Sequence, residues 1–444
     1  MIASEPRLKV GVLDHRQQVR GTFNGGFALP DGRQCHGAFT AVVANGAVVL
    51  KNGSGETWLS APAIHCRSVA AATFTLQEVV IGIAFHWERK EDQTFAGDLL
   101  LLAREEGTLA AINAIAVEDY LASVISSEMS ATAPVELLRS HAITSRSWLV
   151  AMLEREQREQ RRGRPSQRTL ARPGELIRWY DREDHDLYDV CADDHCQRYQ
   201  GVTKIIAPAA AAAVQATRGV FLVYAHEICD ARFSKACGGL SENFENAWEN
   251  TPVPYLQCLA DARQPHAPLR SEAEAEQWIL SQPDAFCNTT DGRILQQILP
   301  SFDQETTDFF RWQVSYAREQ LEEILHRKSG MRFGALRDLV PVQRGPSGRL
   351  VKLKIVGSEQ TLIVGKELEI RRWLSPSHLY SSAFVVKTER DGRGLPVRFT
   401  LHGAGWGHGV GFCQIGAAVM AIAGYGAEEI VRHYFRGAEL QKLY

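Results

Sequence analysis

The feature that most constrains the fold is a change of residue pattern near residue 117. Before it, β-branched and aromatic runs such as AFTAVVANGAVVL are separated by turn sequences that carry Gly and Asp, the pattern of strands. After it, EDYLASVISSEM places Tyr120, Leu121, Val124 and Ile125 at helical spacing. Strand patterns return in LVKLKIVG, TLIVG and SAFVVKTE. This order predicts an α+β protein whose β-rich N- and C-terminal parts surround a helical core.

A second helix is predicted after a break at Ala131 to Pro134. Pro134 suits its first turn, and VELLRSHAITSRSWLVAMLERE continues it with an inward face of Leu137, Leu138, Ala142, Trp148 and Leu149. Residues 262–330 are predicted to form a helical insertion. One helix face there would carry Phe310, Val314, Ala317, Leu321, Ile324 and Leu325, and we expect it to pack in a core.

A length of 444 residues suits two to three domains. We place the boundaries where the composition changes. They give an N-terminal β-rich domain at 1–112 and a core at 113–261 with an arginine-rich insertion at about 154–180. The helical insertion at 262–330 follows. The last part, at 331–444, is β-rich and carries a glycine-dense turn that completes the core.

Charge and hydropathy exclude several function classes. The formal net charge is −3, from 49 basic and 52 acidic side chains, which favours neither nucleic acid nor an anionic membrane as a partner. No apolar stretch is long enough to predict a transmembrane segment. The first residues, MIASEPRLKVGVLDH, contain no apolar signal-peptide region, so a cytoplasmic location is expected if this N-terminus is native.

Nine scattered cysteines do not form the pattern of a small disulfide scaffold, and we expect most to be buried thiols. The exception is the spacing of His185, Cys191 and Cys196. Imidazole and thiolate are zinc ligands, and these three would fill three positions of a tetrahedral site, with His195 or water as the fourth ligand. The alternative is two reduced cysteines and a solvent-facing histidine.

The segment GAGWGHGVGFCQIG holds six glycines in fourteen residues. It has neither the Gly-Lys-Ser/Thr of a phosphate loop nor the spacing of a dinucleotide-binding loop, so no organic cofactor is implied. Trp406 would offer an aromatic face beside the hydrogen-bonding groups of His408 and Gln414, an arrangement that suits a sugar. The alternative is a tightly packed turn with a structural histidine.

Four separated segments together resemble the stage II sporulation protein D and amidase enhancer family. They are INAIAVEDYLASVISSEMSATAPVELLRSHAITSRSW, HDLYDVCADDHCQRYQG, ARFSKACGGLSENFENAW and GWGHGVGFCQIGAAVMA with its tail GYGAEEIVRHYF. The resemblance implies lytic cleavage of peptidoglycan glycan strands between N-acetylmuramic acid and N-acetylglucosamine. It implies strands already stripped of stem peptides by an amidase, and a groove that binds the glycan.

Carried onto this sequence, the family's catalytic glutamate in a Ser-Glu-Met motif is Glu128. An ordinary glycosidase needs two carboxylates. A lytic transglycosylase needs one, because the 6-hydroxyl of the sugar attacks the anomeric carbon and leaves a 1,6-anhydro end. Glu128 would act as acid and then as base, and apolar neighbours such as Ile125 and Met129 would have to favour its protonated form. On the Ser-Glu-Met motif alone, a solvated glutamate at a helix end is the alternative.

The resemblance also supplies candidates for substrate placement, namely Arg146, Ser234, Trp406, His408 and Gln414. Arg146 would hold Glu128 or a sugar substituent through a forked hydrogen bond, or else form an interior salt bridge. Ser234 precedes a Gly-Gly pair that would let the backbone approach a glycan closely. In some family members the histidine and two cysteines bind zinc beside the groove, which implies a structural ion here.

Two other functions compete with the transglycosylase. Part of the family is named for enhancing a cell-wall amidase, so the chain would be a glycan-binding regulator with the amidase as partner. A zinc hydrolase that cuts the amide link to the stem peptide is the third hypothesis. Peptidoglycan as substrate implies the cell envelope or periplasm, in contrast to the location expected from the first residues.

Overall fold

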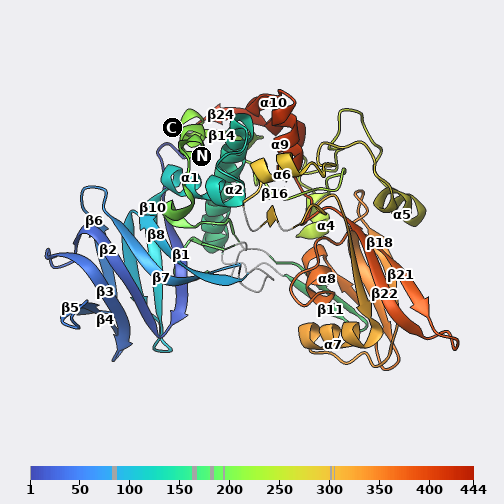
Figure 1. Cartoon of the computed structure of the whole chain (residues 1–444), viewed down its shortest axis with the longest axis horizontal. Helices are drawn as coiled ribbons and strands as arrows, with labels where there is room; N and C mark the ends of the chain where they lie inside the picture. The colour runs from blue at the N-terminus through green and yellow to red at the C-terminus, as the bar shows by residue number, and fades with distance from the viewer. Residues whose placement is uncertain are drawn as a thin grey trace. The chain divides into compact units, whose positions relative to one another are not determined.

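The computed structural model describes residues 2–82, 88–162, 168–180, 185–193, 196–300, 303–304 and 306–444, and within helix α2 the side chains of residues 156–162 are not described. Helices and several sheets are interspersed along the chain, which confirms the α+β prediction (Figure 1). The chain forms two compact units. The N-terminal unit contains Met1–Ala142, Arg182–Val220 and Lys442–Tyr444, and the C-terminal unit contains Ile143–Asp181 and Phe221–Gln441.

The N-terminal unit is built on a sheet of eleven strands. Nine follow the order β13-β1-β10-β9-β6-β2-β3-β4-β5, and β7 pairs with both β2 and β8. The strand bounds are β1 Arg7–Arg16, β2 Gln18–Ala28, β3 Gln34–Ala44, β4 Ala47–Asn52, β5 Thr57–Ala61, β6 Ala63–Ser68, β7 Thr73–Ile81, β8 Arg89–Ala96, β9 Asp98–Ala103, β10 Leu109–Ala116 and β13 Val190–Cys191.

Aromatic side chains fill the inner face of this sheet. Phe23 stacks on Phe39 with ring centroids 4.4 Å apart, and Phe74 stacks on Phe95 at 5.5 Å. All four rings are buried, and burying a ring of this size stabilises the fold by roughly 1.5–3 kcal/mol. The aromatic residues of the runs that predicted strands are therefore part of the buried core.

The N-terminal unit also contains helices, and the first of them follows β10 without a connecting loop. They are α1 Val117–Glu128, the first part of α2 Val135–Arg162, the 3-10 helix η1 Gly201–Lys204 and α3 Pro208–Ala216. Every residue of α1 except Asp119 is buried. The predicted break holds, because Pro134 directly precedes α2 and the five residues expected on its inward face are buried.

The C-terminal unit holds several smaller sheets. The first has the order β11-β12-β20-β19-β18, the second β17-β22-β21 and the third β15-β14-β24, while β16 pairs with β23. The strand bounds are β11 Thr169–Arg172, β12 Glu175–Arg178, β14 Val220–Tyr224, β15 Glu227–Ile228, β16 Phe233–Ser234, β17 Arg311–Ala317, β18 Leu336–Arg344, β19 Leu350–Gly357, β20 Thr361–Gly365, β21 Phe384–Arg390, β22 Pro396–Ala404, β23 Phe412–Cys413 and β24 Glu439–Lys442.

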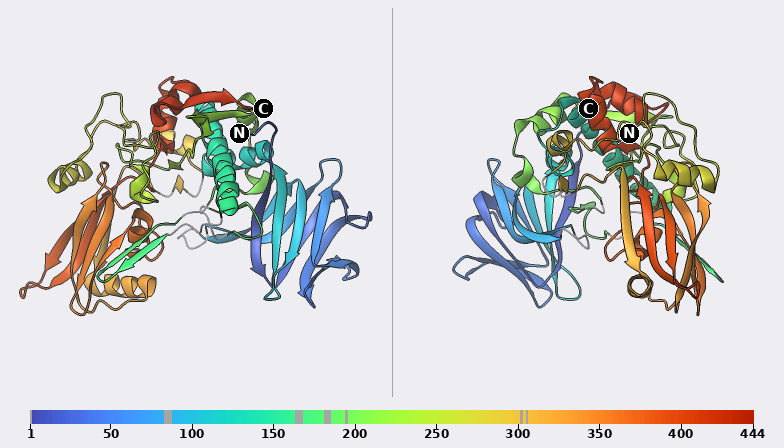
Figure 2. Two further views of the ribbon diagram at one scale, coloured as in Figure 1. Left: turned by 180° about the vertical axis from the view of Figure 1, so that it is seen from behind. Right: turned by 45° about the vertical axis from the view of Figure 1, so that its right-hand side comes forward.

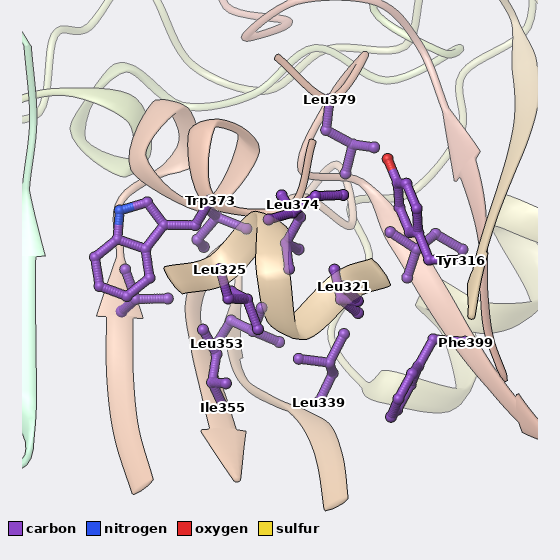
Figure 3. Close-up of a cluster of buried hydrophobic side chains, with 14 of the residues drawn as sticks. Tyr316, Leu321, Leu325, Leu339, Leu353, Ile355, Trp373, Leu374, Leu379 and Phe399 are labelled. Carbon is purple, nitrogen blue, oxygen red and sulfur yellow. The ribbon is translucent and has the colours of Figure 1, made fainter. Parts of the chain in front are cut away.

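Helices cover these sheets and join them. They are α4 Phe244–Ala247, α5 Glu272–Leu280, α6 Gly292–Ile298, α7 Arg318–Ser329, α8 Glu367–Trp373, α9 Gln414–Ile422 and α10 Ala427–Tyr434. Helix α7 packs against β17 and β22 (Figure 2). Its Leu321 and Leu325 point at Leu339 of β18 and Leu353 of β19, which forms the main apolar core of the unit (Figure 3).

The helical stripe predicted across residues 310–325 is wrong in its first half. Residues 311–317 form β17, which pairs antiparallel with β22 from Arg311↔Ala404 to Ala317↔Arg398. Phe310, Val314 and Ala317 are therefore not on a helix, whereas Leu321, Ile324 and Leu325 are buried on α7. Pairing with a strand some eighty residues further along outweighs the local spacing, which also fitted a helix.

The two compact units have other boundaries than the four domains predicted from the sequence. The four domains therefore stay predictions. Segment 262–330 contributes β17 to a sheet with β21 and β22 as well as helices α5, α6 and α7. Among the residues that the structure describes, no helix combines the length and apolar character needed to cross a bilayer.

Candidate active site and metal centre

Glu128 is the last residue of α1, and its side chain is almost entirely buried, with 7% of its surface exposed. Its neighbours Ile125 and Met129 are fully buried, as the sequence predicted for an apolar wall. The main-chain N–H of Arg198 donates to Oε1 of Glu128 across 3.0 Å. A buried carboxylate with such a donor has a fixed orientation, which a catalytic acid requires.

The segment that supplies this donor is itself fixed in the N-terminal unit. Tyr199 is buried, its ring stacks on Tyr120 at 4.9 Å, and its O–H donates to Asn113 Oδ1 across 2.5 Å. The N–H of Gln200 donates to Ser123 Oγ of α1 across 3.2 Å. Residues 198–200 therefore hold the end of α1 through main-chain donors, backed by an aromatic stack.

The candidate zinc ligands lie just before this segment. Cys191 ends the short strand β13, which pairs parallel with β1 at Val10↔Val190 and Gly11↔Cys191. His185 Nε2 lies 3.3 Å from Cys196 Sγ, and the ligand atoms of His185, Cys191 and Cys196 all lie within 4.8 Å of one another. These residues fit three positions of a tetrahedral zinc site. His195, the predicted fourth ligand, lies outside the described residues.

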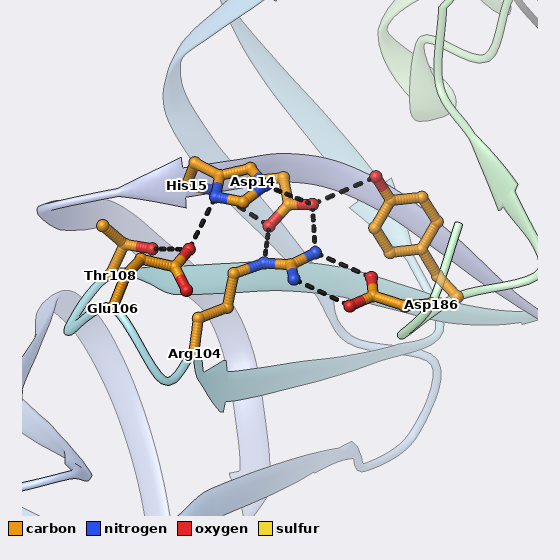
Figure 4. Close-up of polar contacts among 7 residues, drawn as sticks. Asp14, His15, Arg104, Glu106, Thr108 and Asp186 are labelled. Carbon is orange, nitrogen blue, oxygen red and sulfur yellow. Dashed lines mark hydrogen bonds and ion pairs between the residues drawn. The ribbon is translucent and has the colours of Figure 1, made fainter. Parts of the chain in front are cut away.

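A polar network fastens the start of this loop to the sheet (Figure 4). Arg104 donates to both oxygens of Asp14 across 2.6 Å and to both oxygens of Asp186 across 2.9 Å. Tyr188 O–H donates to Asp14 Oδ2 across 3.1 Å. Burial by itself would raise the pKa of Asp14, but hydrogen bonds from Arg104 and from the His15 N–H outweigh it and lower that pKa. The ionised network holds Asp186, the neighbour of His185, in place.

The second group of predicted residues belongs to the C-terminal unit. Trp406 is half-buried, with its ring 4.2 Å from that of Tyr380 and 4.8 Å from that of Phe309. Its main chain exchanges hydrogen bonds of 2.7 and 3.1 Å with Ala236. Ser234, in β16, pairs with Cys413 of β23. The glycine-dense turn and the segment around Ser234 are therefore parts of one structure.

His408 sits inside this turn. Its Nδ1 accepts the N–H of Val410 across 3.0 Å, and its ring meets that of Trp248 edge to face at 4.8 Å. Burial, followed by the positive charges of Arg232, Arg349 and Arg371, holds the pKa of His408 well below its usual value. His408 is therefore neutral near pH 7, with Nδ1 as the acceptor.

Arg349, to which no sequence motif pointed, contacts several residues of the turn. Its guanidinium is buried and donates to the carbonyl oxygens of Gly407, at 3.2 Å, and Cys237, at 3.0 Å. A Cβ on Gly409 would lie 2.3 Å from Arg349 Cζ, and one on Gly405 2.9 Å from Nη2. Both glycines also have positive φ, of 73° and 74°. These two positions require glycine because the backbone wraps a buried guanidinium.

The remaining candidates are buried. Arg146 is fully buried in α2, where a guanidinium has to be paired, and Gln414 is buried at the first position of α9. Ser234 Oγ is buried and has no hydrogen-bond partner among the described residues. A Cβ on Gly407 would lie 2.9 Å from Ser234 Cβ, so Ser234 packs against the glycine-dense turn.

The structure thus gathers the predicted residues into two groups. The N-terminal unit holds Glu128 with His185, Cys191 and Cys196, and the C-terminal unit holds Arg146, Ser234, Trp406, His408 and Gln414. Arg198, Tyr199 and Arg349 are the residues that sequence reasoning missed. The first two lie within the motif HDLYDVCADDHCQRYQG and were quoted there without a role, whereas nothing around Arg349 signals its contacts.

Comparison with known proteins defines the class of this α+β chain. Residues 105–224 match the family model described as stage II sporulation protein, and residues 242–411 match a domain of unknown function (DUF8618). Glu128 and the three candidate zinc ligands lie within the first match. The chain therefore carries a domain of the stage II sporulation protein D and amidase enhancer family, which confirms the resemblance seen in the motifs.

Individual relatives carry the same names. Stage II sporulation protein D of Bacillus amyloliquefaciens is 23% identical over 328 residues, which cover 74% of this chain and 75% of that protein. Stage II sporulation protein D of Bacillus subtilis strain 168 is 22% identical over 331 residues, covering 74% and 75%. The amidase enhancer of Bacillus subtilis strain 168 is 22% identical over 249 residues, covering 51% of this chain and 32% of that protein.

Proposed function

We propose that the chain is a cell-wall enzyme, a lytic transglycosylase that cleaves glycan strands of peptidoglycan between N-acetylmuramic acid and N-acetylglucosamine. The observation that carries the proposal is the position of Glu128. It is a buried glutamate in the family-matched domain, and the Arg198 N–H fixes one of its oxygens. The preferred substrate is a strand from which stem peptides have been removed.

The proposed reaction needs one carboxyl group. The protonated carboxyl of Glu128 gives its proton to the glycosidic oxygen while the bond from that oxygen to the anomeric carbon of the muramic sugar breaks. The 6-hydroxyl oxygen of the same sugar then bonds to the anomeric carbon, and the carboxylate of Glu128 takes up the hydroxyl proton. The products are a free 4-hydroxyl end and a 1,6-anhydro end, and no water is consumed.

We further propose that His185, Cys191 and Cys196 hold a structural zinc ion. Their ligand atoms already lie within 4.8 Å of one another, and Arg198 follows two residues after Cys196. When bound, the ion would cross-link the loop and so fix the backbone that donates to Glu128. In this proposal the protein's own residues do the chemistry, and removing the metal loosens Glu128 without removing the acid.

The C-terminal group is proposed to place the glycan. Trp406 lies within the glycine-dense turn and is half-buried. Gln414 follows the turn in sequence, and Ser234 pairs with Cys413 at its end. His408 contributes as a positioning residue, because its Nδ1 already accepts the Val410 N–H. Arg146 contributes from the interior, because its guanidinium is fully buried.

The second candidate function is a glycan-binding enhancer of a cell-wall amidase, without turnover. The similarity to the amidase enhancer of Bacillus subtilis favours it, although that match covers 32% of the relative. Both functions place the protein in the cell envelope, in contact with peptidoglycan and, for the enhancer, with an amidase.

One digest separates the two functions. Peptide-free glycan strands are incubated with the parent protein, with Glu128→Gln, and with Glu136→Gln, whose glutamate pairs with Arg139 near the start of α2. We expect anhydro-ended fragments from the parent and Glu136→Gln, and a loss of at least about 100-fold in Glu128→Gln. Strand binding without cleavage by all three proteins would reject the enzyme and favour the enhancer.

A further inference from the structure

A second cluster of metal-binding side chains lies within the C-terminal unit, in residues to which the sequence analysis gave no metal. Cys237, Asp261, Cys287 and Cys413 are all buried, and one ligand atom of each lies within 4.8 Å of the other three. We propose that these four residues hold a zinc ion. The proposal concerns a site separate from Glu128 and does not depend on the proposed transglycosylase.

The distances fit a tetrahedral ion. With zinc–sulfur bonds of about 2.3 Å, two thiolates on one zinc lie about 3.8 Å apart, and a thiolate and a carboxylate oxygen about 3.5 Å apart. Cys237 Sγ lies 3.6 Å from Cys287 Sγ and 3.4 Å from Asp261 Oδ2. These two separations are close to those that a shared zinc ion imposes, and the other ligand atoms lie within 4.8 Å of one another.

Hydrogen bonds around the cluster orient its ligands. Tyr434 O–H donates to Asp261 Oδ1 across 2.6 Å, so it orients the carboxylate while Oδ2 faces the thiols. The N–H of Cys237 donates to Cys413 Sγ across 3.3 Å. Hydrogen bonds of this kind to carboxylate and sulfur ligands are typical around protein-bound metals. Cys413 also occupies the residue position directly before α9, at the N-terminus of the helix, where the helix dipole favours a thiolate.

The absence of a side chain at Gly416 provides the space that the carboxylate of Asp261 occupies. A Cβ on Gly416 would lie 2.4 Å from Asp261 Oδ2 and 2.6 Å from the Tyr434 hydroxyl oxygen. Asp261 is fully buried, and the side-chain nitrogen of His433 lies 3.9 Å from its Oδ1. Burying a carboxylate beside three thiols is costly unless a cation compensates the charge, and a divalent ion would do so.

A zinc ion here would have a structural role. Four protein ligands close the coordination shell, whereas catalytic zinc sites keep one position open. The ligands come from four separate segments, namely the residue run after β16, the loop before α5, the loop before α6, and β23. The ion would tie the loop-rich region between residues 235 and 290 to the segment that carries the glycine-dense turn. Cross-links of this kind stabilise regions with little regular structure.

The test has to separate this site from the candidate zinc site at His185. The double variant Cys191→Ser/Cys196→Ser removes the latter, and its metal content is measured by elemental analysis and native mass spectrometry after purification without metal-affinity resin. We expect one equivalent of zinc to remain. Exchange for Co²⁺ should give the visible absorption of a tetrahedral ion together with thiolate-to-cobalt charge-transfer bands.

Further variants in the same background assign the ion. Cys287→Ser and Asp261→Asn should each lower zinc affinity by about 10-fold or more, whereas Cys229→Ser, a buried thiol outside the cluster, should keep the full equivalent. Intact mass under denaturing conditions tests for a disulfide between Cys237 and Cys287. The proposal would be overturned if the folded background protein contained no metal or contained that disulfide. It would also be overturned if Cys287→Ser left the bound zinc unchanged. If Cys287→Ser fails to fold, the metal content and cobalt spectrum of the background protein decide alone.

Discussion

The main-chain N–H of Arg198 meets the Oε1 of Glu128 across 3.0 Å. The donor belongs to a segment that begins two residues after Cys196, and the acceptor ends a helix that continues directly from β10. The orientation of the proposed acid therefore depends on a loop that is distant in sequence. Conditions that loosen this loop should reduce activity even when Glu128 itself is unchanged.

Replacing Cys196 by Ser tests this dependence. The change removes one thiolate from the candidate zinc set, so we expect bound zinc to fall by one equivalent and glycan cleavage by about 10- to 100-fold. Cys258→Ser, outside both metal clusters, should keep parent activity and metal content. Full activity of a Cys196→Ser protein that has lost its zinc would show that the loop does not control Glu128.

Arg104→Gln tests the network that holds Asp186. The variant loses hydrogen bonds to Asp14, which is largely buried, and to Asp186, whose side chain is mostly exposed. Charged hydrogen bonds to a partly buried group contribute about 1.5–3 kcal/mol, and an exposed pair adds little. We expect the free energy of unfolding to drop by about 2–3 kcal/mol in urea titrations. Arg33→Gln, which breaks an exposed pair with Asp31, should unfold like the parent.

The same network predicts a pH dependence. The pKa of Asp14 is lowered in the folded protein, because its hydrogen bonds outweigh its burial. An ionised group with a lowered pKa stabilises the fold above the ordinary aspartate pKa of about 4, and this contribution is lost as pH falls through the lowered value. The stability gap between parent and Asp14→Asn should be constant near neutrality and should shrink below about pH 4. A gap that persists in acid would contradict this assignment.

The sequence predicted the elements whose pattern is local. Helices α1 and α2 lie where their residue spacing indicated. The prediction of one helix from Phe310 to Leu325 was wrong because a strand and a helix follow each other there, and the spacing of their apolar residues fits a single helix. Leu321 and Leu325 follow helical spacing, whereas Val314 pairs with Leu401 of β22, a partner that local periodicity does not reveal.

The candidate site was predictable only where motifs carry it. The Ser-Glu-Met motif pointed to Glu128, but its donor is a main-chain N–H, which no side-chain pattern encodes. Arg349 is a lone arginine in sequence, and its contacts with Gly405 and Gly409 arise only on folding. Cys237, Cys287 and Cys413 are separated by 50 and 126 positions, so their spacing gave no sign of a shared site.

Gly409→Ala tests the role of Arg349 in the turn. The new Cβ would lie 2.3 Å from Arg349 Cζ at a φ of 73°, so the variant combines backbone strain with a clash. Strain alone costs about 1–2 kcal/mol and overpacking adds about 1–3 kcal/mol. Gly424→Ala is the matched control, since its φ is 94° and no atom lies within 4 Å of the new Cβ. Chemical unfolding should show the larger loss at Gly409, and equal losses would argue against a buried clash.

The role of Glu128 as the acid is tested by a digest of peptide-free glycan strands in water enriched in heavy oxygen, with mass analysis of the new ends. We expect unlabelled 1,6-anhydro ends from the parent protein, because the 6-hydroxyl and not water attacks the anomeric carbon, and no new ends from Glu128→Gln. Heavy oxygen at the new reducing ends would show hydrolysis, and unlabelled anhydro ends formed equally by Glu128→Gln would show that Glu128 is not the acid. Either result would contradict the proposed transglycosylase reaction of Glu128.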